Sequence, residues 1–134
     1  MQDRDYEVLA NFRYTLRRFL KFSEEAAGAV GLSPQQHQAL LFTRSSGKRR
    51  VTVGALAEWL QIKPHSAAEL SSRLETAGLL ERREDPEDRR RTLLTVSEYG
   101  TRLLESLTEV HRRELQRLKE PVRELLAMLD DDHA

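Results

Sequence analysis

Apolar side chains recur every three or four residues along the first 30 positions of the chain, the spacing of a helix with one buried face. The stripe consists of Val8, Leu9, Phe12, Leu16, Phe19 and Leu20. Gly31 follows it, and glycine readily adopts the left-handed conformation that ends a helix. The pattern therefore predicts a long first helix over residues 6 to about 30.

Three shorter helices are predicted next, and their ends are marked by local signals. Ser33 and Pro34 start the first, because serine caps free amides and proline fits the first helical position. Gly78 ends the last. The helices span residues 33 to about 44, about 52 to 60 and about 64 to 77, with a turn at Gln61-Ile62. Two short helices around a tight turn form a helix-turn-helix.

Residues 79–96 are predicted to form two short strands around a charged loop. Asp85-Pro86 is a turn signal, and residues 92–96 have the β-branched and apolar content of a returning strand. The tip carries Arg89, Arg90 and Arg91. An arginine-bearing hairpin suits the minor groove of DNA, where negative potential is concentrated. The alternative is a solvated charged hairpin, and the preceding helix-turn-helix favours the DNA interpretation.

After Ser97, a second apolar stripe advances by threes and fours to residue 129, and Pro121 predicts a break between helices over residues 97–119 and 121–129. A chain this small cannot easily cover this stripe and the first helix, so the pattern predicts a homodimer. The predicted interface residues are Phe12, Leu107, His111, Leu115, Leu118, Val122 and Leu125. For His111 we favour a packed or interface histidine over a ligand.

Composition narrows the class of protein. With 134 residues and 39% hydrophobic content, the chain fits one domain. It has no cysteine, which excludes disulfides, thiolate zinc sites and thiol redox sensing. The polar N-terminus and the lack of a long apolar run predict a soluble, cytoplasmic protein with no membrane partner. No enzyme motif is present and the four histidines are not spaced as metal ligands, so no catalytic residue, metal or cofactor is expected.

The formal net charge is zero, which argues against a broad basic surface. Affinity for DNA would then depend on local clusters at Lys48-Arg49-Arg50 and in the hairpin loop. The acidic run Asp130-Asp131-Asp132 is expected to be a solvated tail rather than a cation site.

The second helix of a helix-turn-helix reads bases in the major groove. The predicted exposed residues are Lys63, Pro64, His65, Ser66, Glu69 and Arg73, opposite a buried face of Ala67, Leu70 and Leu74. His65 and Ser66 can offer hydrogen bonds to bases, although His65 could also contact nothing. Arg73 is better placed for a phosphate. Glu69 either orients a neighbouring arginine, which we favour, or accepts a hydrogen bond from cytosine.

With these elements in place, the chain resembles the MarR family of winged-helix transcriptional regulators. The resemblance rests on the segments LAEWL at 56–60, RLETAGLLER at 73–82, DPEDRR at 85–90 and VSEYG at 96–100. It implies a mainly α fold with a small β-hairpin, in which a winged helix-turn-helix core of about 33–96 is flanked by dimerisation helices of about 4–30 and 97–131. It also implies that Asp88 shapes the wing, that Arg90 enters the minor groove, and that Arg73 contacts the DNA backbone.

The chain also departs from the family pattern. Lys63 and Pro64 stand where many members have a serine or threonine and a polar residue, and Glu69 where a basic residue is common. Base preference therefore cannot be carried over. The family's cavity for small, often aromatic, anionic effectors suggests a pocket lined by Tyr14, Arg17 and His37, with Arg17 as a carboxylate partner. The alternative makes Arg17 a surface charge and His37 part of the core edge.

The sequence thus predicts a homodimeric repressor that binds a pseudo-palindromic operator in double-stranded DNA and is released by a small effector. Two alternatives stay open. One is a winged-helix protein-interaction module that does not bind DNA, which zero net charge and Glu69 favour. The other is a DNA-binding regulator without an effector.

Overall fold

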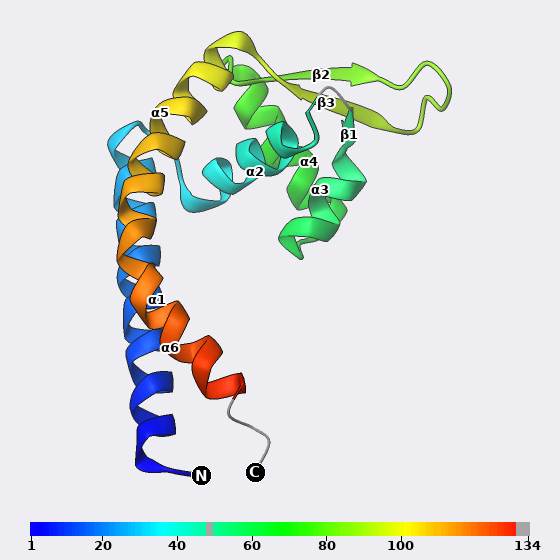
Figure 1. Ribbon diagram of the computed structural model, residues 1–134. Helices are drawn as coiled ribbons and strands as arrows, with labels where there is room; N and C mark the ends of the chain where they lie inside the picture. Colours follow the sequence, from blue (N-terminus) through cyan, green and yellow to red (C-terminus); the bar gives the residue numbers. More distant parts are fainter. Residues whose placement is uncertain (48–49, 131–134) are drawn as a thin grey trace. The chain divides into compact units, whose positions relative to one another are not determined.

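The structure, a computed structural model, describes residues 1–47 and 50–130 (Figure 1). Most of the predicted Lys48-Arg49-Arg50 cluster and of the acidic run at 130–132 lies outside the described residues. The chain divides into two compact units, which we call the helical unit and the winged unit. The helical unit comprises Met1–Ala26 and the chain from Thr108 on, and the winged unit comprises Ala27–Leu107.

The winged unit contains three short helices and a small antiparallel sheet, followed by the first half of a long helix. Its elements are α2 (Pro34–Ser45), β1 (Val51–Thr52), α3 (Val53–Leu60), α4 (Pro64–Thr76), β2 (Leu80–Glu84), β3 (Thr92–Val96) and the start of α5 (Glu98–Leu115). The strand order is β1-β3-β2. The predicted helix-turn-helix and hairpin are confirmed, whereas β1 was not predicted. Its two residues are too few to produce a recognisable pattern and are defined by pairing with β3.

The core of the winged unit is made of leucines from the helices and the sheet. The fully buried members are Leu40, Leu56, Leu74, Leu80 and Leu94. They come from α2, α3, α4, β2 and β3, so the core draws on the three short helices and on both strands of the hairpin. The core therefore fixes the hairpin against the helices.

Side-chain caps set the starts of α2 and α3. Ser33 Oγ accepts from the Gln36 amide at 3.1 Å while Gln36 Oε1 accepts from the Ser33 amide at 2.9 Å, a capping box. Thr52 Oγ1 accepts from the Ala55 amide at 3.0 Å and starts α3. Gln61 then adopts the left-handed conformation, with φ of 58°, and reverses the chain towards α4. These local interactions explain why the sequence signals gave the correct boundaries.

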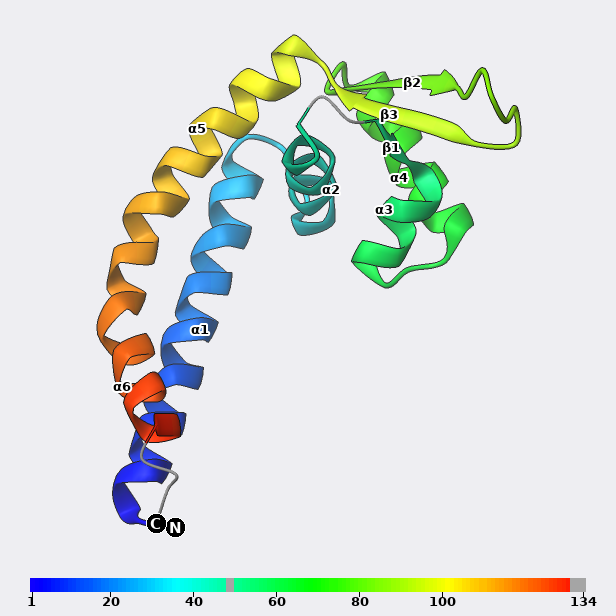
Figure 2. The same cartoon turned by 45° about the vertical axis from the view of Figure 1, so that its right-hand side comes forward.

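The helical unit contains α1 (Asp3–Ala29) up to residue 26, the end of α5, a 3-10 turn (Gln116–Leu118) and α6 (Lys119–Asp130). Figure 2 shows α1 running beside the end of α5 and α6. His111 packs between α1 and α5: its Nε2 lies 2.7 Å from Ser23 Oγ, and its ring meets those of Phe19 and Phe22 edge-on. His111 is therefore a packed histidine within one chain.

The predicted helix break lies upstream of its expected place. The irregular turn occupies residues 116–118, and α6 begins before Pro121 rather than at it. A proline ring clashes with the carbonyl four residues earlier, which belongs to Arg117. The distortion therefore falls in the preceding turn, and Pro121 itself sits in the first turn of α6, where its missing amide costs little. Among the described residues, no helix is long and apolar enough to span a membrane.

Candidate nucleic-acid interface

The exposed face of α4 is the first part of the site. Ala67, Leu70 and Leu74 are buried, as predicted. The opposite face carries the predicted reading residues, of which Ser66 is half-buried and the others are exposed: Lys63, Pro64, His65, Ser66, Glu69 and Arg73. Among the described residues Glu69 has no ion-pair partner, so no arginine is oriented by it in the free protein. The face is therefore open along its whole length.

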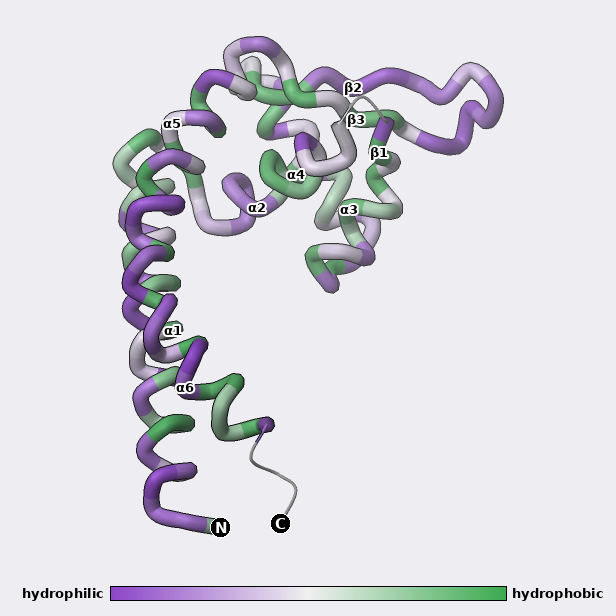
Figure 3. The backbone as a smooth tube through the Cα atoms, viewed as in Figure 1, coloured by the Kyte–Doolittle hydropathy of each residue, from purple (hydrophilic) through white to green (hydrophobic). Residues whose placement is uncertain are grey.

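The loop between β2 and β3, the wing, is the second part. Figures 1 and 2 show it projecting beyond the helices of its unit, and Figure 3 shows that it is mostly hydrophilic. Asp85 closes the loop: its Oδ1 accepts from the Glu87 amide at 2.9 Å, and its own amide donates to the Arg91 carbonyl at 3.0 Å. An aspartate that binds the backbone two residues on is a common turn device. These hydrogen bonds give the loop a defined shape.

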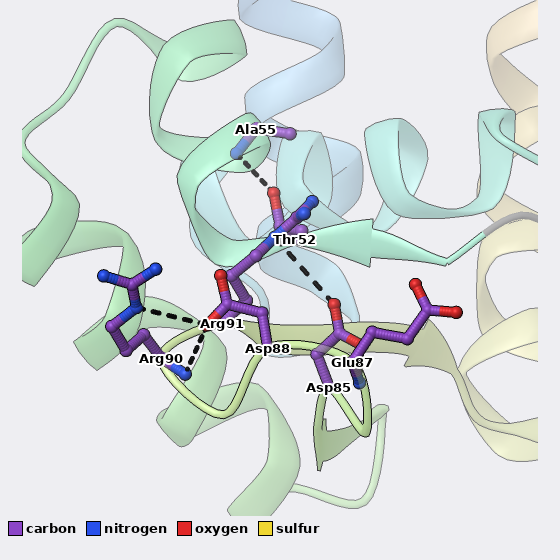
Figure 4. Close-up of polar contacts among 7 residues, drawn as sticks. All are labelled: Thr52, Ala55, Asp85, Glu87, Asp88, Arg90 and Arg91. Atoms are coloured by element: carbon purple, nitrogen blue, oxygen red, sulfur yellow. Dashed lines mark hydrogen bonds and ion pairs between the residues drawn. The ribbon is translucent and has the colours of Figure 1, made fainter.

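Asp88 and Arg90 form the tip of the wing (Figure 4). Asp88 Oδ1 accepts from both the amide and the Nε of Arg90, at 3.1 and 3.2 Å. These hydrogen bonds, and the positive charge of Arg91, hold the pKa of the Asp88 carboxyl below its usual value of 3.8. The Arg90 side chain remains 90% exposed. One carboxylate therefore orients a guanidinium that is otherwise free to bind an anion.

The side chain of Arg91 points away from that of Arg90 (Figure 4). Its Nε lies 4.0 Å from Asp85 Oδ2, and it lines a cleft of about 500 Å³ between the wing and the helix-turn-helix. The lining of the cleft includes Thr52, Pro64, His65, Arg82, Arg90 and Arg91. Reading helix and wing therefore border one depression that carries three arginines.

Arg82 is the residue of this cleft that the sequence analysis missed. It lies on β2 opposite Leu94 of β3, so it shares the sheet face of buried Leu80 and Leu94. Alternation along β2 was the available signal, because Leu80 and Arg82 are two residues apart. Without the register and the position of α4, that signal places Arg82 in the core or at its edge, with no indication of a cleft.

The predicted effector residues are distributed over the two units. Tyr14 and Arg17 are exposed on α1 in the helical unit, and the guanidinium carbon of Arg18 lies 5.6 Å from the centre of the Tyr14 ring. His37 belongs to α2 in the winged unit and is buried. The effector pocket remains a prediction.

The predicted dimer residues fall into two groups. Leu107 and His111 are buried within the chain and have little surface left for a partner. The others are exposed or half-buried, namely Phe12, Leu115, Leu118, Val122 and Leu125. The helical unit also exposes Leu126 and Leu129, which the prediction did not include as interface residues. The dimer itself remains a prediction.

Comparison with known proteins identifies the fold and a family model that matches part of the chain. The MarR family model matches residues 30–91. A variant of MepR from Staphylococcus aureus, bound to an oligodeoxyribonucleotide, is 21% identical with a TM-score of 0.72 over 90% of this chain and 91% of that one. YusO from Bacillus subtilis is 18% identical, with a TM-score of 0.73 over 95% and 94% of the two chains. Apo MarR from E. coli is also 18% identical, with a TM-score of 0.69 over 91% and 93%.

No curated protein sequence matches the chain. The family model covers α2, the helix-turn-helix, β2 and the wing up to Arg91, which are the elements that carry the exposed face of α4 and the arginine-bearing loop. Over residues 30–91 this chain matches the model of the MarR family, and its fold is that of the winged-helix structures of MepR, YusO and MarR.

Proposed function

We propose that this protein is a homodimer that binds a pseudo-palindromic operator in double-stranded DNA and regulates transcription by occupying it. One observation carries the proposal: the exposed face of α4 and the wing with Arg90 border the same cleft in one unit. A reading helix and a basic wing on one surface suit a major groove and the adjacent minor groove. A DNA-bound relative with the same fold adds support.

Within this proposal the residues of α4 have different tasks. His65, Ser66 and Glu69 face the base edges, where Glu69 can accept a hydrogen bond from cytosine. Lys63 and Arg73 contact phosphates, which position the helix without reading sequence. Changes at the first three should alter base preference, whereas changes at the basic pair should weaken binding to every sequence.

The wing contributes Arg90 to the minor groove, flanked by Arg89 and Arg91. Asp88 binds the amide and Nε of Arg90, so the guanidinium is held in one orientation before DNA arrives. Holding it in advance lowers the conformational entropy lost on binding. Asp88 is therefore a positioning residue for the DNA contact.

A second copy of the chain is the proposed partner of the helical unit. Leu126 and Leu129 of α6 are 54% and 58% exposed, and Leu115 of α5 is exposed as well. Because about half of each side chain is already covered, burying the remainder contributes on the order of 1 kcal/mol each. A two-fold dimer would present two α4 helices to half-sites about 34 to 36 Å apart.

The regulatory part of the proposal rests on the family resemblance. The dimer acts as a cytoplasmic repressor, and a small aromatic anion at Tyr14, Arg17 and His37 releases it by changing the separation of the two reading helices. Arg17 is exposed and can bind a carboxylate. Equal spacing of the reading helices with and without the effector would refute this release mechanism.

The first experiment is a titration of the purified protein against a duplex of the intergenic DNA upstream of its own gene, with an unrelated duplex of equal length as the control. We expect at least ~10³-fold preference for the first and a steep loss of affinity with salt. Arg90→Ala should weaken binding to both duplexes, whereas Arg102→Ala, which removes an exposed arginine from α5, should not.

Equal and weak binding to both duplexes would call for a selection from random DNA. Failure of that selection to enrich any sequence would refute the proposal in favour of a protein-interaction module.

A further inference from the structure

We infer that Arg82 binds a backbone phosphate of the DNA strand that separates the two grooves, in the cleft between the wing and α4. The inference rests on the proposed function and deepens it. Adjacent major and minor grooves share one sugar-phosphate strand as their common wall. If α4 occupies one groove and the wing the next, that strand must cross the protein surface between them. The cleft lies there.

Arg82 reaches this cleft from the helix-facing side of the sheet. Its partner across the ladder is Leu94, and Leu80 is two residues earlier on the same face, both of them buried. Arg83, the next residue on β2, points to the opposite face and lines a separate hollow with Leu93 and Thr95. One strand thus carries two neighbouring arginines on different faces, of which only Arg82 lines the cleft.

The guanidinium of Arg82 is poorly satisfied in the free protein. Its Nε is buried and makes no hydrogen bond, the only buried side-chain nitrogen or oxygen of the described residues in that state. Its Nη1 lies 4.0 Å from Glu75 Oε1, at the limit of an ion pair. The side chain as a whole is 26% exposed. Burying a charged donor without a partner costs stability, and an incoming phosphate would supply acceptors for the exposed end.

The other residues of the cleft suit the same ligand. Arg91 lies on its wing side and His65 on its α4 side. The Thr52 hydroxyl accepts from the Ala55 amide, which leaves its hydrogen to donate. Glu75 is the acidic group nearest Arg82, at 4.0 Å. A phosphate can compete with this long contact, because it accepts two hydrogen bonds from one guanidinium. The cleft therefore favours an anion shared between a helix and a wing.

The test compares Arg82→Gln with Arg83→Gln, which removes the same charge from the next residue of the same strand. Binding to a selected operator duplex is measured by fluorescence anisotropy from about 50 to about 200 mM salt. We expect Arg82→Gln to weaken binding about tenfold or more. The slope of log affinity against log salt should also fall by about 0.9 per subunit. Arg83→Gln should keep the wild-type slope, and neither variant should change base preference.

Two further measurements separate a phosphate contact from a general effect of charge or folding. Arg82→Lys should restore the salt slope but only part of the affinity, because lysine lacks the planar fork of arginine. Thermal melting should show that Arg82→Gln is folded. In a second measurement, phosphates of the operator are replaced one at a time by neutral methylphosphonates. At one position the replacement should weaken binding by the wild type but should not weaken binding by Arg82→Gln any further. That position should lie between the bases contacted by α4 and those contacted by the wing.

The outcomes distinguish this inference from the proposed function. If Arg90→Ala loses binding while Arg82→Gln keeps wild-type affinity and salt slope, the inference is wrong and the function stands. The inference is also wrong if, at every position, the methylphosphonate reduces the affinity of Arg82→Gln by the same factor as that of the wild type. If the wild type binds no selected duplex, the proposed function and the inference fail together.

Discussion

Gly100 stands where strand β3 passes into α5, and replacing it with alanine should destabilise the winged unit. A β-carbon at this position would lie far inside van der Waals contact with the Leu79 carbonyl oxygen and 2.9 Å from Cγ1 of Val96. The same carbonyl accepts the Ser97 amide at 3.0 Å, and Ser97 Oγ accepts the Gly100 amide at 2.9 Å. To relieve the clash, either the Leu79 carbonyl or the backbone at residue 100 must move. Either movement weakens one of the two hydrogen bonds of Ser97 that cap α5.

The net effect follows from three contributions. Alanine favours the helix over glycine by about 1 kcal/mol. Overpacking against backbone costs about 1 to 3 kcal/mol, and weakening a capping hydrogen bond costs about 1 kcal/mol more. We therefore expect a loss of about 2 kcal/mol in the free energy of unfolding, the middle of this range. For a chain of 134 residues this corresponds to a fall in Tm on the order of 8 °C.

The assay is urea unfolding followed by circular dichroism at fixed protein concentration, with Gly28→Ala as the control. Gly28 also lies in a helix, and a β-carbon there would have no atom within 4 Å. That substitution should stabilise the protein by about 0.5 to 1 kcal/mol. If Gly100→Ala were as stable as Gly28→Ala, the close approach of α5 to Leu79 would be wrong.

Three further predictions concern the wing, the dimer and the core of the helical unit. The Asp88 carboxyl should titrate below 3.8 by NMR, and Arg90→Gln should raise its midpoint, whereas an unchanged midpoint would refute the paired hydrogen bonds. Because the pKa of Asp88 is lowered in the folded protein, the interaction of its carboxylate with Arg90 contributes fully to wing stability above pH 3.8. The contribution is lost as the pH falls through the lowered pKa. Leu129→Asp should reduce the mass by light scattering from twice 15.5 kDa to that of one chain, and a mass that stays at one value for both proteins would contradict the proposed interface. His111→Ala should lower the free energy of unfolding by about 2 to 3 kcal/mol, because it removes the packed ring and leaves the buried Ser23 hydroxyl without its partner, and a loss below about 0.5 kcal/mol would show that the ring is not packed.

Local interactions explain the features that were predicted correctly. The start of α2 depends on Ser33 and Gln36, three residues apart, and the start of α3 on Thr52. The turn of the wing depends on Asp85 and Asp88, whose partners lie two to six residues further on. Such contacts form between neighbours in the chain, so residue type and spacing are sufficient to predict them.

The features that were missed depend on contacts between distant segments. β1 is a strand only because Val51 and Thr52 pair with β3 some 40 residues later. His111 was predicted to be packed or at an interface, and only the contact with Ser23, 88 residues away, decides that it packs within one chain.

Arg82 gives the clearest case. Alternation along β2 puts Arg82 on the same face as Leu80, but only the strand register and the position of α4 decide that its side chain ends in an arginine-lined cleft rather than among leucines. The sequence by itself determined the helices, the turns and the exposed arginines of the wing, because these follow from short-range backbone preferences and side-chain caps. Only the tertiary structure decided which charged groups share a surface, since that depends on packing between elements that are far apart in the chain.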